Sequence, residues 1–152
     1  MNYTVPTQVT ELQMIYNNRV MAKDRPQVKS SYDAYKIFQA NWSEQIGFIE
    51  EFYILLLDRS NRVMGKYKVS QGGLAGTIVD AKVIFAAALK GRASALILAH
   101  NHPSGNLKPS QADIDITKKL RDGGKLLDTP ILDHLILSPE GGYYSFADEA
   151  LL

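Results

Sequence analysis

The fold of this chain is decided by residues 98–113, which read Leu-Ala-His-Asn-His-Pro-Ser-Gly-Asn-Leu-Lys-Pro-Ser-Gln-Ala-Asp. The stretch continues an apolar run that starts at residue 95, and such a run predicts a buried strand ending at His100. Residues 101–109 form a loop rich in Pro, Ser, Gly and Asn, and Ser110 is a suitable N-cap for the helix that follows. A strand end, a short loop and a helix start are therefore expected to meet at one point.

Two histidines and an aspartate in this stretch have the spacing of a metal site. His100 and His102 are two residues apart, so on a strand they share a face, with Cα atoms about 6.5–7 Å apart. Asp113 falls in the first turn of the next helix. Two neutral imidazoles and one carboxylate are the ligand set of a catalytic zinc site, which keeps a fourth position for water. Histidines near a strand end are also ordinary polar loop residues, but Pro103, Ser110 and Asp113 at these offsets favour the metal site.

A zinc-bound water also needs a general base, and two glutamates are candidates. Glu50 and Glu51 directly precede the apolar run 52–57, which predicts a second buried strand. Because side chains alternate along a strand, the two carboxylates are expected on opposite faces.

Three further polar residues need an interpretation. Ser110 either caps its helix or donates a hydrogen bond to a developing oxyanion, and if Asp113 binds a metal we expect it not to reach back to the cap. His134 is expected to be satisfied within the sheet or to support a ligand, rather than to bind the metal. Asp115 is expected on the surface.

The remaining pattern predicts an α/β (α+β) fold, a mixed sheet covered by helices on both faces. Residues 1–44 are expected to be an N-terminal extension packed on a domain formed by residues 45–152. The expected elements are an extended segment 4–16, a basic loop 17–30, helices 31–42, 80–90 and 110–121, and strands 52–57, 63–69, 95–100, 131–137 and 143–146. The helix that begins at Ser110 is expected to stop at Asp122-Gly123-Gly124.

The amino-acid composition restricts which catalytic groups and metal ligands the chain can supply. The chain has 152 residues and no cysteine, so thiolate nucleophiles, disulfides and the usual structural zinc sites are excluded, and any metal is held by His, Asp or Glu. A cysteine-free chain without a signal peptide or a membrane-spanning apolar run fits the cytoplasm. The net charge of +1 does not support nucleic-acid binding. Two local basic patches are expected to be solvated faces: Arg19, Lys23, Arg25 and Lys29, and Lys118, Lys119, Arg121 and Lys125.

Three other site types do not fit. The letters His-Asn-His suggest an HNH nuclease. In those nucleases, however, the three residues are spread over a much longer ββα element, whereas here they are contiguous. Zinc nucleoside deaminases need a Pro-Cys-x-x-Cys segment, and this chain has no cysteine. The glycine-rich segment of a P-loop is also absent.

The residues as a set resemble a known family. His100-x-His102-Pro103-x6-Ser110-x2-Asp113 matches the JAMM (MPN+) metalloprotease motif. The segments 100–105, 109–113, 133–136 and 144–146 are similar to the bacterial RadC family, with the resemblance covering about residues 45–152. It implies a JAMM fold related in architecture to cytidine deaminases. Longer RadC proteins carry an N-terminal helix-hairpin-helix region that has no counterpart in residues 1–44, so a short form is expected.

The resemblance also implies roles for the site residues. Zn²⁺ would be held by His100, His102 and Asp113, Glu50 would activate the water with Glu51 as second choice, and Ser110 would assist the oxyanion. The expected function is amide hydrolysis on a peptide or protein substrate. The family's DNA-repair label motivates an alternative, a DNA-associated accessory protein in which the zinc is structural or vestigial. A metal-dependent nuclease is a third, weaker option.

Overall fold

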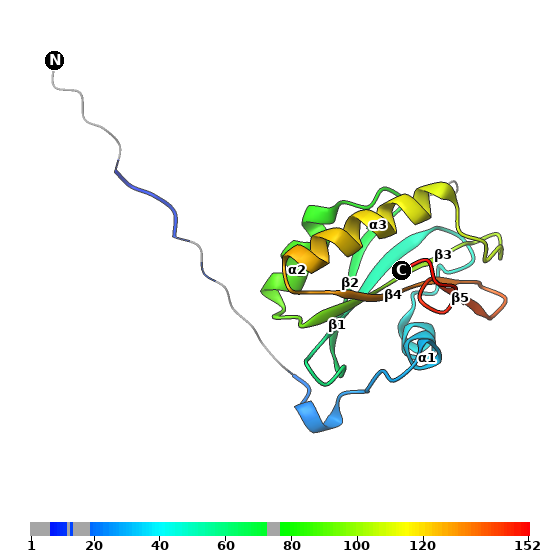
Figure 1. Cartoon of the computed structure of the whole chain (residues 1–152), viewed down its shortest axis with the longest axis horizontal. Coiled ribbons are helices and arrows are strands. Elements are labelled where there is room, and N and C mark those ends of the chain that lie inside the picture. Colours follow the sequence, from blue (N-terminus) through cyan, green and yellow to red (C-terminus); the bar gives the residue numbers. More distant parts are fainter. Residues whose placement is uncertain (1–6, 12, 14–18, 73–76) are drawn as a thin grey trace, which may run out of the picture.

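The computed structural model describes residues 7–11, 13, 19–72 and 77–152 (Figure 1). The expected extended segment 4–16 and the start of the expected loop 17–30 lie partly outside these residues. Five strands form one mixed sheet in the order β2-β1-β3-β4-β5. β3 pairs antiparallel with β1 and parallel with β4, and the outer pairs are antiparallel. The strands are β1 (Glu51–Leu57), β2 (Val63–Gln71), β3 (Ala95–Asn101), β4 (Ile131–Leu137) and β5 (Tyr143–Ser145).

Helices cover both faces of this sheet, as Figure 1 shows. One face of β1 packs with α1 (Ser31–Asn41) through residues such as Tyr53 and Leu55, and the other face, including Phe52 and Ile54, packs with the helices that follow β2 and β3. These helices are α2 (Ala81–Lys90) and α3 (Gln111–Leu126). The predicted mixed sheet between helices is confirmed.

The apolar runs of β1 and β3 are buried along their whole length. Because alternate side chains enter different cores, both faces of each strand must be apolar, which explains the absence of an alternating pattern. Each fully buried Leu or Ile contributes roughly 1.5–3 kcal/mol from the removal of apolar surface from water, before conformational entropy is subtracted.

The residue before each of α1 and α2 caps the helix with its side chain. Asp33 N–H donates to Ser30 Oγ at 3.2 Å, and Lys82 N–H donates to the Asp80 carboxylate at 2.9 Å. The segment expected to be a basic loop includes a short 3-10 helix, η1 (Ala22–Asp24).

The expected end of α3 was wrong. The helix runs on to Leu126 through Gly123 and Gly124, which were interpreted as a stop signal. These glycines are needed for packing instead. A Cβ at Gly124 would lie 2.5 Å from the Thr129 carbonyl oxygen, and one at Gly123 would lie 2.9 Å from the Phe85 ring.

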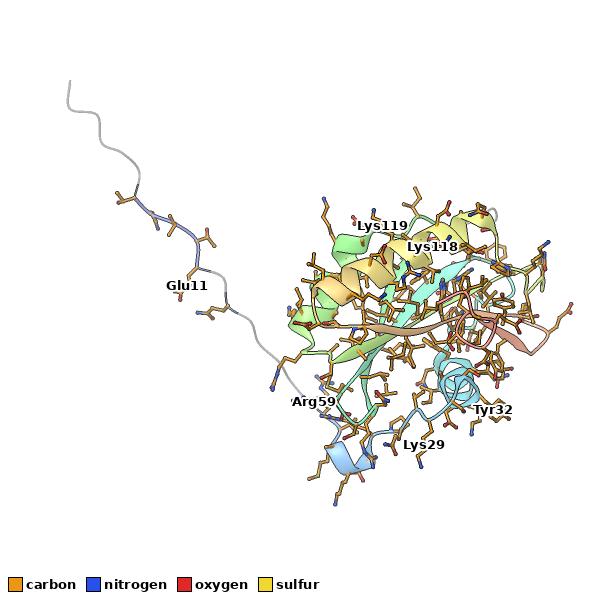
Figure 2. All side chains as sticks on the ribbon, viewed as in Figure 1. Glu11, Lys29, Tyr32, Arg59, Lys118 and Lys119 are labelled. Carbon is orange, nitrogen blue, oxygen red and sulfur yellow. The ribbon has the colours of Figure 1, made fainter. Side chains whose placement is uncertain are left out.

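The two basic patches lie on different layers of the molecule. Figure 2 shows Lys118 and Lys119 on α3 and Lys29 on the side of α1. Arg25 is paired with Asp58 at 3.2 Å, and Arg121 with Asp122 at 3.1 Å. The patches therefore do not join into one surface. Within the described ranges, none of the helices is both long and apolar enough to cross a bilayer.

Gly124→Ala tests the packing role of this glycine. Alanine favours a helix by about 0.8–1 kcal/mol over glycine. Its Cβ would nevertheless meet backbone at 2.5 Å, so we expect a net loss of about 1–3 kcal/mol in the free energy of unfolding, measured by urea denaturation. Gly65→Ala is the control, because a Cβ at Gly65 has nothing within 4 Å. An unchanged or higher stability of Gly124→Ala would contradict the interpretation.

Candidate metal centre

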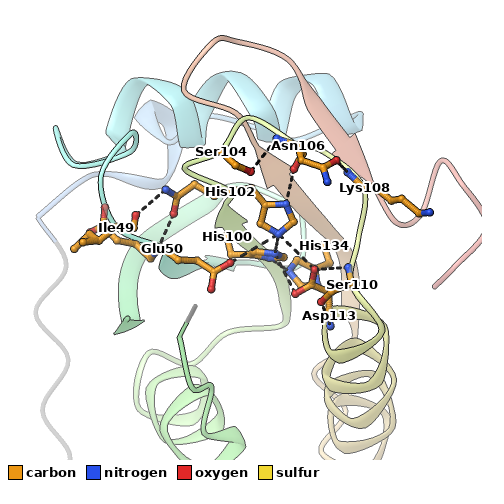
Figure 3. Close-up of polar contacts among 12 residues, drawn as sticks. Ile49, Glu50, His100, His102, Ser104, Asn106, Lys108, Ser110, Asp113 and His134 are labelled. Atoms are coloured by element: carbon orange, nitrogen blue, oxygen red, sulfur yellow. Dashed lines mark hydrogen bonds and ion pairs between the residues drawn. The ribbon is translucent and has the colours of Figure 1, made fainter. Parts of the chain in front are cut away.

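The register of the sheet brings Glu50 to the end of β3. In the antiparallel pair of β1 and β3, Phe52 lies opposite His100, so the residue that precedes β1 lies beside the histidines. In the parallel pair of β3 and β4, Leu98 lies opposite His134, which places this third histidine one step behind His100 on the same face. The first turn of α3 contributes Asp113, and the resulting cluster is shown in Figure 3.

Two imidazole nitrogens and one carboxylate converge in this cluster. His100 Nε2 lies 3.0 Å from His102 Nε2. Asp113 Oδ1 lies 3.3 Å from His100 Nε2, and Asp113 Oδ2 lies 3.4 Å from His102 Nε2. Ligand atoms on a tetrahedral zinc, each about 2.0–2.1 Å from the ion, are about 3.3–3.4 Å apart. The three side chains therefore have the spacing that a metal ion of this size requires.

The tautomer of His102 is set by a backbone carbonyl. Its Nδ1 contacts the Asn106 carbonyl oxygen, which can only accept, so Nδ1 carries the proton. The neutral ring then presents a lone pair at Nε2, the atom that faces the cluster.

The tautomer of His100 is set by a longer chain of hydrogen bonds that also ends on a carbonyl. The Thr117 hydroxyl donates to the Asp113 carbonyl oxygen at 2.6 Å, so its oxygen accepts from His134 Nδ1–H at 2.6 Å. His134 Nε2 is then an acceptor and takes the proton of His100 Nδ1 at 2.8 Å. Burial lowers the pKa of His134 well below its ordinary value, so this ring is neutral. His100 therefore also presents a bare Nε2.

The Nε2 lone pairs of His100 and His102 are 3.0 Å apart and lie beside the Asp113 carboxylate. Because these groups repel one another, a positive charge between them would stabilise the arrangement. A hydrogen bond to Asp113 raises the pKa of His102 above its ordinary value, which favours a proton on this ring when no metal is bound. Burial alone would raise the pKa of Asp113, but hydrogen bonds with His100 and His102 outweigh it and hold this pKa well below its usual range. The donor set fits a divalent cation, which would replace the proton.

Glu50 lies beside the two histidines and is partly buried. Its Oε1 is 3.8 Å from His102 Nε2, and one donor atom each of Glu50, His100 and His102 lie within 4.8 Å of one another. The segment before β1 is fixed by the buried Asn101 side chain, which donates to the carbonyls of Ile46 and Ile49. Glu50 could bind the metal directly or contact a water on it.

Glu51, the second candidate for the base, points to the other face of the sheet. It is fully buried, accepts hydrogen bonds from Ser43 and Tyr53, and pairs with Lys68 at 2.5 Å. Burial raises the pKa of Glu51, but the bonds from Lys68 and Ser43 outweigh it, so this pKa is below its ordinary value. Its contacts make it a structural ion pair, away from the histidines.

Ser110 and Asp113 form a complete capping box. Asp113 N–H donates to Ser110 Oγ at 3.1 Å, and Ser110 N–H donates to Asp113 Oδ2 at 2.8 Å. The capping role of Ser110 is therefore present, and Asp113 reaches back to the cap through Oδ2 while its Oδ1 faces His100. The expectation that a metal-bound Asp113 would leave the cap stays a prediction. Asp115 is exposed, as expected.

Sequence reasoning missed two residues of this site. Thr117 was not considered, although it lies one helical turn after Asp113, where a hydroxyl reaches the same side of the helix. Asn101 lies between the two histidines and points to the opposite face, where it fixes the segment before Glu50. His134 Nε2 accepts a hydrogen bond from His100 Nδ1–H, so His134 supports a candidate ligand, which is one of the two roles expected for it.

Comparison with known proteins gives one family. A family model described as the RadC-like JAB domain matches residues 28–151. A UPF0758 protein of Flavobacterium johnsoniae is 51% identical over 124 residues, 82% of this chain and 53% of that protein. UPF0758 proteins of Porphyromonas gingivalis and Thermosynechococcus vestitus are 44% and 46% identical, over 68% and 65% of this chain and 45% and 39% of their own lengths. The matched segment thus spans about half of these relatives or less. The matched range includes α1, and the division at residues 44 and 45 stays a prediction.

Thr117→Val tests the hydrogen-bond chain behind His100. In the variant, His134 Nδ1–H loses its acceptor, so the proton of His100 is no longer held on Nδ1. We therefore expect Zn²⁺ affinity to fall about 10- to 100-fold. The measurement is competition with a chromophoric chelator. Thr129→Val is the matched control, because Thr129 is also buried and its hydroxyl donates to the Leu127 carbonyl, outside the centre. Equal affinities for both variants would contradict the role of the chain.

Metal binding is expected to release a proton. Because the pKa of His102 is raised, this ring holds a proton up to a pH above its ordinary value of about 6.5, and a metal must displace it. The apparent affinity should therefore fall as the pH is lowered through this raised pKa. Calorimetric titration at a pH of about 6.5 in buffers of different ionisation enthalpy measures the release. A binding enthalpy that is the same in all buffers would rule it out.

Proposed function

We propose a function for this chain on the premise that it belongs to the RadC-like JAB domain family, as the match over residues 28–151 shows. The resemblance found in its motifs is thereby confirmed. We infer that the domain is a zinc-dependent hydrolase that cleaves an amide bond of the peptide or isopeptide type. The observation that carries this proposal is the convergence of the Nε2 atoms of His100 and His102 with Asp113, beside a Glu50 carboxylate that is 3.8 Å from His102 Nε2.

The ligand residues favour zinc among the divalent ions. Imidazole nitrogens suit zinc, whereas magnesium and calcium prefer sites made of oxygen atoms alone. His100, His102 and Asp113 would hold the ion through Nε2, Nε2 and Oδ1, and a fourth position would remain for water. When bound, zinc lowers the pKa of such a water to about 7 and polarises a carbonyl oxygen.

Glu50 would carry the proton transfers. Its carboxylate accepts a proton from the attacking water and then donates it to the nitrogen of the leaving amine, which must be protonated before it departs. The position of Glu50, 3.8 Å from His102 Nε2, suits contact with a water at the fourth position. Glu51 would take no part, since its side chain lies on the other face of the sheet.

Ser110 would stabilise the tetrahedral oxyanion. The Ser110 oxygen accepts from the Asp113 N–H in the cap, and this leaves its own hydroxyl proton for donation. Capping and oxyanion stabilisation are therefore compatible, because they use different parts of one hydroxyl group.

Glu50→Gln tests the assignment of the base. The amide cannot accept the proton of water, so we expect kcat for peptide or isopeptide cleavage to fall about 10²- to 10⁴-fold with zinc still bound. Activity on peptide libraries is measured in parallel with zinc content. The control is Glu44→Gln, an exposed glutamate on the same segment before β1.

Two outcomes would count against the proposal. Wild-type activity in Glu50→Gln would remove Glu50 as the base. A zinc-loaded wild type that cleaves no amide substrate would instead favour the alternative, a DNA-associated accessory role with a structural or vestigial zinc.

A further inference from the structure

A cavity of about 200 Å³ lies directly beside the candidate metal centre. Glu50, His100 and Asp113 form one side of it, and these are the same residues whose side chains point toward one another in Figure 3. A substrate held at the centre by its scissile carbonyl would therefore have this cavity next to it.

The other sides of the cavity come from three separate segments and are mostly apolar; the one polar residue among them is Thr77, whose hydroxyl donates to Ser70 Oγ at 3.0 Å. Phe52 of β1 is buried at its base, Val79 lies in the segment before α2, and Ala112 and Ile116 lie one turn apart on α3. Ala112 is exposed and Val79 and Ile116 are partly buried, so the cavity opens to solvent at the start of α3.

The charges around the cavity restrict what it can hold. The carboxylates of Glu50 and Asp113 line it, so an acidic group would be repelled in the metal-free chain, whereas a bound divalent ion would compensate these two charges. A charged group of either sign would also lose hydration against Phe52, Val79 and Ile116. An apolar cavity of about 150 Å³ is large enough for a benzene ring. The space of about 200 Å³ therefore suits one apolar side chain up to the size of leucine or phenylalanine.

We propose that this cavity is a specificity pocket that binds an apolar side chain of the residue next to the cleaved bond. This inference rests on the proposed function, since it assigns a substrate class to the same site. It predicts that substrates with leucine or phenylalanine beside the bond are preferred over those with glycine or aspartate.

Binding of small probes tests the pocket without catalysis. The probes are N-acetyl amides of leucine, phenylalanine, glycine and aspartate, titrated into the full chain with labelled methyl groups, with and without Zn²⁺. We expect the leucine and phenylalanine probes to shift the methyl signals of Val79 and Ile116 and to bind at least about tenfold more tightly than the glycine probe. Equal affinity for the glycine and leucine probes, or shifts confined to other methyl groups, would overturn the proposal.

Ala112→Phe fills the mouth of the cavity from an exposed position. We expect it to abolish the discrimination between leucine and glycine probes. Gln111→Phe is the matched control, because Gln111 is the exposed neighbour in the same helical turn and does not line the cavity. The control should keep the tenfold preference, and an identical loss in both variants would count against the pocket.

Cleavage of peptide libraries by the zinc-loaded chain separates this inference from the proposed function. Probe discrimination without any cleavage would support the pocket and refute the hydrolase. Cleavage with no preference for an apolar neighbour, unchanged in Ala112→Phe, would support the hydrolase and refute the pocket.

Discussion

The candidate centre depends on one chain of hydrogen bonds that runs from His100 through His134 and Thr117 to the carbonyl of Asp113. The chain links β3, β4 and α3, and its direction is fixed because a carbonyl can only accept. Its polarity leaves Nε2 of His100 without a proton. A second carbonyl, that of Asn106, does the same for His102. Backbone geometry thus determines the chemistry of both imidazoles.

The strand register is the second constraint. The pairing of Phe52 with His100 places Glu50 beside the histidines and Glu51 on the opposite face. A slip of one residue would exchange the two glutamates, and would also turn the apolar side chains of β1 over. Asn101 opposes such a slip, because its buried amide binds Glu51 N–H and two carbonyls of the preceding segment. The same contacts that stabilise the sheet therefore select which carboxylate faces the centre.

Much of this arrangement could be predicted from sequence because it depends on local pattern. The apolar runs indicate the central strands, Ser110 indicates the start of α3, and the spacing of His100 and His102 places both rings on one face. What could not be predicted depends on contacts between segments distant in the chain. Gly123 and Gly124 are a stop signal by composition, but close packing against Phe85 and Thr129 keeps them helical. The contact of Thr117 with His134, 17 residues later, becomes visible only once α3 is placed over β4.

Each candidate ligand residue of the centre is held in place by an atom other than the one it would offer to an ion. His100 and His102 are fixed through Nδ1, and Asp113 through Oδ2 and its carbonyl. The conformational entropy of ordering the ligands is therefore lost when the chain folds, and not when the ion arrives. In zinc fingers the metal supplies the free energy of folding. Under the proposed function, loading would be a docking step onto a finished scaffold, so the ion could leave and return while the chain stays folded, and the supply of free zinc would set how much of the protein carries the ion.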